Sequence, residues 1–288
     1  MRKLLKRMSS ARIIALGFAA AIFIGSGLLM LPCSVQNGVD LKYIDALYTS
    51  ASAVCVTGLV TVDIGDTFTA FGQFVVAALI QIGGLGVASM GAGVILAVGK
   101  RINLKGRRVL RDAMNLDSGK GIVKFIKSVF LTTAAFELVG AALSFIVFVR
   151  DYPPLKALGI SLFHSVAAFN NSGFDILGNF QSLSAYKEDV FLNLVTCLLI
   201  FFGGIGFLVI REIVEKHFRW RRFSMHTKVV LMMSIVLTVG GAAIFRITEN
   251  MPWIGALFNS VTARTAGFST YSLGEFSNAG LLAMIFLM

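Results

Sequence analysis

The stretch Ser50-Ala-Ser-Ala-Val-Cys-Val-Thr-Gly-Leu-Val-Thr-Val-Asp63 decides the fold, because the chain repeats its pattern twice more. Each copy opens on Leu, an aromatic residue, a polar residue and Ser, and closes on a small residue, a Gly and a large apolar residue. The copies run from Leu47 to Leu59, from Leu162 to Phe174 and from Leu257 to Phe268. The Leu-to-Gly spacing is 11 residues in the first two copies and 10 in the third. Such internal repetition indicates one structural unit used three times.

The three copies are too short and too polar to span a bilayer, yet each lies between long apolar runs. Irregular backbone at membrane depth is tolerated where protein buries it or where it lines a watery path. A short helix that ends in a glycine turn aims carbonyl oxygens at a cation, and the alternative is a plain tight turn between helices. We expect a cation filter made of Val56, Thr57, Gly58 and Leu59, of Asn171, Ser172, Gly173 and Phe174, and of Thr265, Ala266, Gly267 and Phe268.

The composition indicates a membrane protein: of 288 residues, 56% are hydrophobic and 14% are charged, against about 25% charged in soluble domains. Of the 26 Lys and Arg residues, 20 lie in three clusters, Arg2 to Arg12, Lys100 to Lys127 and Arg211 to Lys228. Cytoplasmic loops carry such an excess, so the N-terminus and the clusters are expected in the cytoplasm of a multi-pass protein of the plasma (inner) membrane. The net charge of +11 reflects topology, and no nucleic-acid partner is expected.

The apolar runs predict an all-helical membrane protein in which a span, a re-entrant pore loop and a return helix recur, as in K+ channels. The expected first spans are Ile13–Leu31, Val123–Val149 and His226–Phe245. The expected pore helices are Ile44–Val56, Gly159–Phe169 and Ile254–Arg264. The expected return helices are Phe68–Val98, Val190–Ile213 and Phe276–Met288.

These elements divide the chain into four parts. They are a first repeat (1–98), a basic cytoplasmic loop (99–122), a second repeat (123–217) and a third repeat (218–288). The last return helix has about 13 residues, whereas a span needs about 20. The third repeat is therefore expected to be incomplete.

A few other residues stand out. A pair of glycines lies in each of the first two return helices, at Gly83 and Gly84 and at Gly203 and Gly204. Each pair serves close helix packing, which we prefer, or a hinge. Glu137 lies near the middle of a span, where a carboxylate either lines an ion path or is satisfied by neighbouring polar groups. Arg264 is expected to brace its pore helix, and His164 to cap its pore helix or pack there.

The sequence carries no motif of an enzyme: it has no Gly-x-Ser-x-Gly, no His-Glu-x-x-His and no phosphate loop. A secondary cation transporter of the Na+/K+ symport type, with alternating access, is the rival interpretation. Broken helices in inverted repeats are typical of that class, whereas these repeats run in the same direction. The three cysteines have neither paired nor metal-binding spacing.

Several motifs together resemble the Ktr/Trk superfamily of potassium transporters, and within it the KtrB (NtpJ-type) membrane subunit. They are Thr57-Gly-Leu-Val60, Phe68-Thr-Ala-Phe-Gly-Gln73, Leu79-Ile-Gln-Ile-Gly-Gly-Leu-Gly86, Phe169-Asn-Asn-Ser-Gly-Phe174 and Thr265-Ala-Gly-Phe268. The resemblance extends over the whole chain. It implies potassium uptake through a central pore, often stimulated by Na+, with K+ and Na+ as transported ions and no covalently bound cofactor.

The resemblance also implies four pore-forming repeats, a homodimer and a cytosolic KtrA-like ring that binds nucleotides and regulates uptake. The basic segments Lys100–Arg111 and Arg211–Lys228 would face this ring. The chain departs from the family in one respect, because no fourth repeat follows the third. It is therefore expected to be a truncated piece that does not conduct ions alone.

Overall fold

The computed structural model describes residues 9–97, 102, 104–114 and 121–288. The described residues leave out the basic residues at positions 2 to 7 and parts of the segment 99–122, which was expected to be a cytoplasmic loop. The chain separates into two compact units, each described by itself. The first comprises residues 1–56, 60–62 and 67–135. The second comprises 57–59, 63–66 and 136–288, so all three expected filter loops fall within it, apart from Val56.

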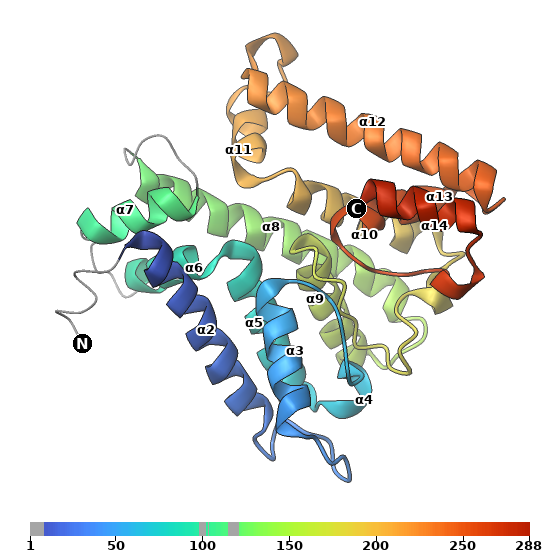
Figure 1. The fold of residues 1–288 in the computed structure, drawn as a ribbon, viewed down its shortest axis with the longest axis horizontal. Coiled ribbons are helices and arrows are strands. Elements are labelled where there is room, and N and C mark those ends of the chain that lie inside the picture. The colour runs from blue at the N-terminus through green and yellow to red at the C-terminus, as the bar shows by residue number, and fades with distance from the viewer. Residues whose placement is uncertain (1–8, 98–101, 103, 115–120) are drawn as a thin grey trace. The chain divides into compact units, whose positions relative to one another are not determined.

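The first unit is a cluster of helices around the first pore helix. Helices α2 (Ser10–Leu29), α3 (Tyr43–Cys55) and α5 (Ala70–Leu85) pack against one another (Figure 1). Helices α6 (Val87–Ala97) and α7 (Leu104–Ala113) pack together and against α2. The segment that includes α7 was expected to be a loop, but its described part is helical because Leu110 turns inward to a core shared with Ala92 and Ile126.

The second unit contains the other two repeats. Helix α8 (Ile122–Phe148) enters it at Phe136 and is followed by α9 (Pro154–Phe169), α10 (Val190–Gly204) and α11 (Phe207–Glu215). Helices α12 (Met225–Thr248), α13 (Trp253–Thr265) and α14 (Asn278–Leu287) complete it (Figure 1). Helix α10 packs against both α9 and α13, and α12 packs against α13 and α14. The one-turn helix α4 (Ile64–Thr67) follows the first filter loop.

Three of the described helices, α2, α8 and α12, are long and apolar enough to cross a membrane. They are the three expected first spans, and their ends agree with the predicted ranges to within about three residues. The bent pair α10 and α11 would make a fourth span if it crosses as one segment. The all-helical repeat of span, short pore helix and return helix agrees with the sequence prediction.

Each return helix begins at a side chain that caps it. Thr69, Asp189 and Ser277 accept hydrogen bonds from the backbone N–H groups of Gly72, Leu192 and Gly280, at 3.3, 2.8 and 3.1 Å. Such capping satisfies an N–H group that would otherwise lack a partner in the first turn. The start of each return helix is therefore set by the sequence at the same point of the three repeats.

The prediction that the first two return helices are continuous was wrong. The first is interrupted at Gly86, where φ is +80°, and the second is interrupted before Phe207, with a bend of 97°. Gly206 has a φ of +85°, which a right-handed helix cannot contain and which glycine adopts without steric penalty. The interruption lies at the third glycine of each Gly-Gly-x-Gly stretch, two residues beyond the pair.

Candidate functional site: three glycine loops at the ends of the pore helices

The three candidate filter loops share a left-handed glycine. The φ angles of Gly58, Gly173 and Gly267 are +72°, +72° and +81°. Two of the loops also place a non-glycine residue in the left-handed region, Val56 and Asn171, both at +56°. Such a conformation is rare for a β-branched residue such as valine and costs free energy, which the surrounding structure must offset.

The loops follow one another at van der Waals contact. The carbonyl oxygen of Ser172 lies 2.2 Å from the position of a Cβ built on Gly58, and that of Ala266 lies 2.3 Å from the same position on Gly173. The first loop therefore touches the second, and the second touches the third. Apart from Gly267 itself and its two chain neighbours, no heavy atom of the described residues lies within 4 Å of the Cβ position on Gly267.

Hydrogen bonds tie the loops together again just beyond the glycines. Asp63 and Asp66 accept bonds from the backbone N–H groups of Phe180 and Asn179, at 2.7 and 2.8 Å. The N–H group of Leu183 donates to the carbonyl of Ser269 at 2.9 Å, which joins the second loop region to the third. Neighbouring loops are therefore in contact at two places, at the glycines and again at the hydrogen bonds that follow them.

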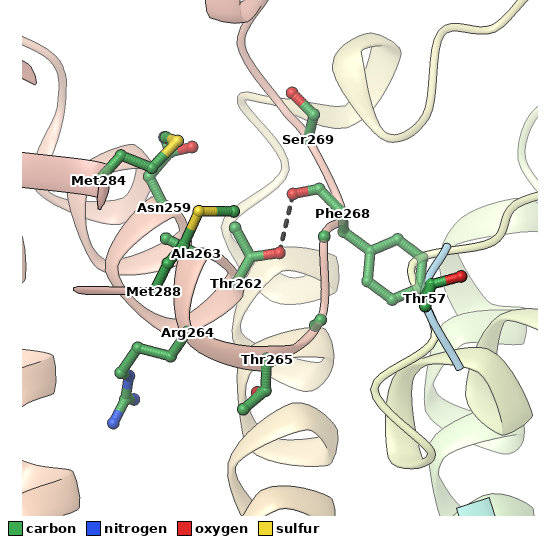
Figure 2. A pocket seen from close by; sticks show the side chains of 12 residues that line it. Thr57, Asn259, Thr262, Ala263, Arg264, Thr265, Phe268, Ser269, Met284 and Met288 are labelled. Atoms are coloured by element: carbon green, nitrogen blue, oxygen red, sulfur yellow. Dashed lines mark hydrogen bonds between the residues drawn. The ribbon is translucent and has the colours of Figure 1, made fainter. Parts of the chain in front are cut away.

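The third loop borders a cavity of about 340 Å³. Its lining includes Thr57 of the first loop, the stretch from Thr262 to Ser269, Met284 of the last helix, and Met288 directly after that helix (Figure 2). The hydroxyl of Thr262 donates to the carbonyl of Phe268 at 2.8 Å, which holds the loop against the end of its own pore helix. In Figure 2 the guanidinium of Arg264 points away from Phe268.

Buried aromatic side chains support the second and third loops from behind. Phe174 and Phe268 are almost completely buried. His164, also buried, packs edge-on against Phe268 and Phe148 and shares a hydrogen bond of 2.9 Å with the Thr196 hydroxyl. The expectation that His164 packs within its pore helix environment agrees with these contacts.

The glycine pairs of the return helices lie against the ends of the pore helices. A Cβ on Gly83 would lie 2.2 Å from the carbonyl oxygen of Val54, and one on Gly203 would lie 1.8 Å from that of Phe169. These distances are far below any real contact, so both glycines permit close packing, the preferred interpretation. A hinge at Gly84 or Gly204 stays a prediction, and the helix interruption itself lies at the following glycine.

Sequence reasoning missed two sets of glycines. Gly86 and Gly206, at the helix interruptions, were recognisable as the last residue of each Gly-Gly-x-Gly stretch. Gly25, Gly140 and Gly241 lie opposite the motif serines, at Cβ-to-Oγ distances of 2.5, 2.4 and 2.4 Å. The signal for this second set was a glycine in each first span, ahead of the serine of each copy.

The arrangement is that of a multi-pass membrane protein with repeated pore loops. A family model described as TrkH, a cation transport protein, matches residues 10–232, and the chain belongs to this family. Membership in a family of cation transport proteins agrees with the expectation that the chain is not an enzyme.

Individual relatives agree with the family match. The chain is 36% identical to the potassium/sodium uptake protein NtpJ of Enterococcus hirae, over 100% of this chain and 65% of the relative. It is 37% identical to the Ktr system potassium uptake protein B of Bacillus subtilis, over 98% of this chain and 65% of the relative. The chain therefore spans about two thirds of the length of these relatives.

The fold has a counterpart among solved structures. The crystal structure of the potassium transporter TrkH from Vibrio parahaemolyticus superimposes with a TM-score of 0.71, at 15% identity, over 98% of this chain and 56% of that one. At this level of identity the likeness concerns the fold alone.

Proposed function

We propose that the protein takes up potassium ions across the plasma membrane through a central path lined by the carbonyl groups of the three glycine loops. The observation that carries the proposal is the contact order of the loops, in which a carbonyl of each following loop lies against the glycine of the one before it. Carbonyl groups gathered in this way replace the water of a dehydrated cation. The names of the relatives, which refer to potassium and to potassium/sodium uptake, support K+ with Na+ as a second ion.

The filter residues are proposed to be Val56 to Leu59, Asn171 to Phe174 and Thr265 to Phe268. Only the central glycine is common to the three segments, unlike the four identical segments of a strict potassium channel. We therefore expect fewer rigid ion sites and a preference for K+ over Na+ that depends on fewer carbonyl layers.

The partners follow from the same family. We propose a homodimer with a cytosolic N-terminus, and a nucleotide-binding ring of the KtrA type at the cytoplasmic face. The name of the Bacillus subtilis relative, a component of a Ktr system, supports a regulatory subunit. Anionic lipid is the alternative ligand of the basic segments, since each Lys or Arg near a membrane surface contributes about 1 kcal/mol.

Uptake in a bacterial strain that lacks its own potassium transporters tests the proposal. The chain is expressed as it stands and, in parallel, as a chimaera in which it replaces the matching 65% of NtpJ. We expect the chimaera to restore growth at low potassium and to take up Rb+, a tracer for K+. The chain as it stands is assayed in the same way. A chimaera that accumulates in the membrane and moves neither Rb+ nor K+ would refute potassium uptake.

Alternating access is the second candidate function. The interruption of the return helices at Gly86 and Gly206 favours it, because discontinuous helices are typical of secondary transporters. Single-protein flux separates the two mechanisms: a flux far above about 1,000 ions per second supports a pore, since typical turnover of catalysed steps lies below that value.

A further inference from the structure

Each pore helix is attached to the preceding span by a hydrogen bond at an equivalent position. The motif serines Ser50, Ser165 and Ser260 are completely buried. Their hydroxyl groups donate to the carbonyl oxygens of Ile22, Glu137 and Thr238, at 2.8, 2.7 and 2.8 Å. In all three spans the acceptor lies three residues before the glycine that faces the serine, namely Gly25, Gly140 and Gly241. The contact therefore places Ile22, Glu137 and Thr238 at equivalent positions.

A second set of equivalent positions lies on the pore helices. Cys55, Asn170 and Arg264 each stand three residues before the glycine of their loop. In the second repeat the Asn170 amide donates to the Glu137 carboxylate, Nδ2 to Oε1, at 3.1 Å. In the third repeat the Arg264 guanidinium donates to the Thr238 hydroxyl, Nη2 to Oγ1, at 2.5 Å. The same two positions are therefore joined by side chains in both repeats, with different chemistry.

The three repeats differ in the side chains at these two positions. Arg264 of the third repeat makes further hydrogen bonds, and the first repeat has no polar pair there. Arg264 also donates to the carbonyl oxygens of Ser234 and Ser260, at 3.2 and 3.3 Å. In the first repeat the two positions hold Ile22 and Cys55, an alkyl group and a thiol, which do not form a comparable bond. At these two pairs of equivalent positions, the second and third repeats each form two contacts between the span and the pore helix, and the first repeat forms one.

We propose that the pairs Glu137–Asn170 and Thr238–Arg264 are positioning residues that set the ion preference of the second and third glycine loops. Asn170 immediately precedes Asn171, whose left-handed backbone begins the second loop, and Arg264 immediately precedes Thr265 at the start of the third. A side chain fixed to the span at that point holds the last turn of the pore helix in register. The carbonyl oxygens that follow keep their spacing as a result.

Glu137 and Arg264 therefore act through geometry rather than through their charge. A carboxylate and a guanidinium near a filter would attract and repel cations in opposite senses, yet both form the same contact. This distinction provides the test, since Gln retains the acceptor oxygen of Glu137 and removes its charge. Because the pairs matter only if the loops select ions, the inference rests on the proposed function.

The experiment measures the ratio of initial Rb+ to Na+ uptake in the chimaera described above. Glu137→Gln and the first-repeat control Cys55→Ala are expected to keep the parental ratio. Glu137→Leu and Asn170→Leu are each expected to lower it by about threefold to tenfold, the range of one lost ordinary hydrogen bond. The double variant is expected to lower it no further than either single variant, because both changes remove the same contact.

The third repeat supplies a milder variant for the case in which a leucine variant fails to accumulate. Thr238→Val keeps the shape of the side chain and removes the acceptor of Arg264, and we expect a smaller fall in the ratio. A ratio lowered as much by Glu137→Gln as by Glu137→Leu would assign the effect to charge and overturn the inference. An unchanged ratio in Asn170→Leu and Thr238→Val would overturn it as well.

The two proposals fail in different ways. A parent that moves Na+ but not Rb+ would refute potassium uptake, and the response of its ion ratio to these variants would still test the pairs. A parent that takes up Rb+ with a ratio indifferent to the pairs would leave the proposed function intact and refute the inference alone. A parent that moves neither ion would refute both proposals, because residues that set an ion preference require a working ion path.

Discussion

The carbonyl oxygen of Ser172 lies where a Cβ atom on Gly58 would have to be, only 2.2 Å from that position. The carbonyl oxygen of Ala266 lies likewise 2.3 Å from the Cβ position of Gly173. Around the Cβ position of Gly267, no described residue other than its chain neighbours has a heavy atom within 4 Å. All three glycines have a left-handed backbone. Two of them are thus required for two reasons, backbone conformation and the neighbouring carbonyl, and the third for one.

Alanine substitution should separate these two requirements. Gly267→Ala is expected to lower the free energy of unfolding only by the cost of a left-handed alanine, about 1–2 kcal/mol. Gly58→Ala and Gly173→Ala also displace a neighbouring loop, so we expect them to lower the melting temperature of the purified 288-residue chain in detergent by more than Gly267→Ala does. Equal losses of thermal stability for the three substitutions would contradict the contact order of the loops.

The second prediction concerns the glycine pair in α10. Gly203→Ala would force a Cβ to within 1.8 Å of the Phe169 carbonyl oxygen, whereas Gly204→Ala would meet the side chains of Asn171 and Thr265, at 3.1 and 3.8 Å. If the pair serves packing, Gly203→Ala costs about 2 kcal/mol or more, as overpacking does, and Gly204→Ala is close to neutral. The measurement is the melting temperature of the purified protein. Comparable losses at both positions would favour a hinge instead.

The repeats could be predicted from the sequence because short stretches of residues determine them. Spans, pore helices and capped return helices follow from apolar length and from residues such as Ser277, whose side chain caps the turn that it begins. The glycine loops followed from the threefold motif, and the same motif contains the three serines that attach the pore helices. Their acceptors are backbone carbonyls, which exist at every position, so the sequence alone could not identify Ile22 or Glu137 as partners.

The interruptions of the return helices were missed for a different reason. Gly86 and Gly206 lie within apolar runs whose hydropathy is that of an unbroken span, and glycine is common in membrane helices. The repeated Gly-Gly-x-Gly stretch was the available signal, and the backbone angle shows that its last glycine ends the helix. The pairing of Asn170 with Glu137 was likewise invisible, because 33 residues separate them and the contact depends on how α8 and α9 pack.

The loop that follows the second glycine contains a carboxyl group whose pKa is shifted. Asp175 lies between α9 and α10, outside the spanning helices, and burial raises its pKa to about 6. A hydrogen bond from the N–H group of Leu177 lowers the pKa, and the charges of Asp63 and Asp66 raise it. In this range the folded state holds a proton that the unfolded state has released. Asp175 therefore destabilises the fold increasingly as the pH rises from about 4 to about 6.

Asp175→Asn should remove this dependence. The amide keeps the acceptor for Leu177 and carries no charge, so we expect the variant to be up to about 3 kcal/mol more stable than the parent at pH 7.5. The difference should shrink as the pH falls towards 4.5, where the parent carboxyl is mostly protonated. Melting curves of both proteins across this pH range check the prediction, with the exposed Asp40→Asn as the matched control. A constant difference between parent and variant would assign the gain to something other than the proton.

The orientation in the membrane is tested by labelling single cysteines. The native thiols must first be removed, because Cys33 and Cys55 are exposed in the structure, and the buried Cys197 is replaced with them. Gly38→Cys then lies in the loop between α2 and α3, at a left-handed glycine with open space around its Cβ position. Lys105→Cys lies on α7, within the second basic cluster.

An excess of Lys and Arg marks cytoplasmic segments, so Gly38→Cys should react with a membrane-impermeant maleimide in intact cells and Lys105→Cys should not. After the membrane is permeabilised, both positions should react, which shows that the thiol at 105 is accessible to the reagent. Because α2 crosses once between the N-terminus and Gly38, the same experiment assigns the N-terminus to the side opposite Gly38. The reverse labelling would invert every helix and move the basic segments away from any cytosolic partner.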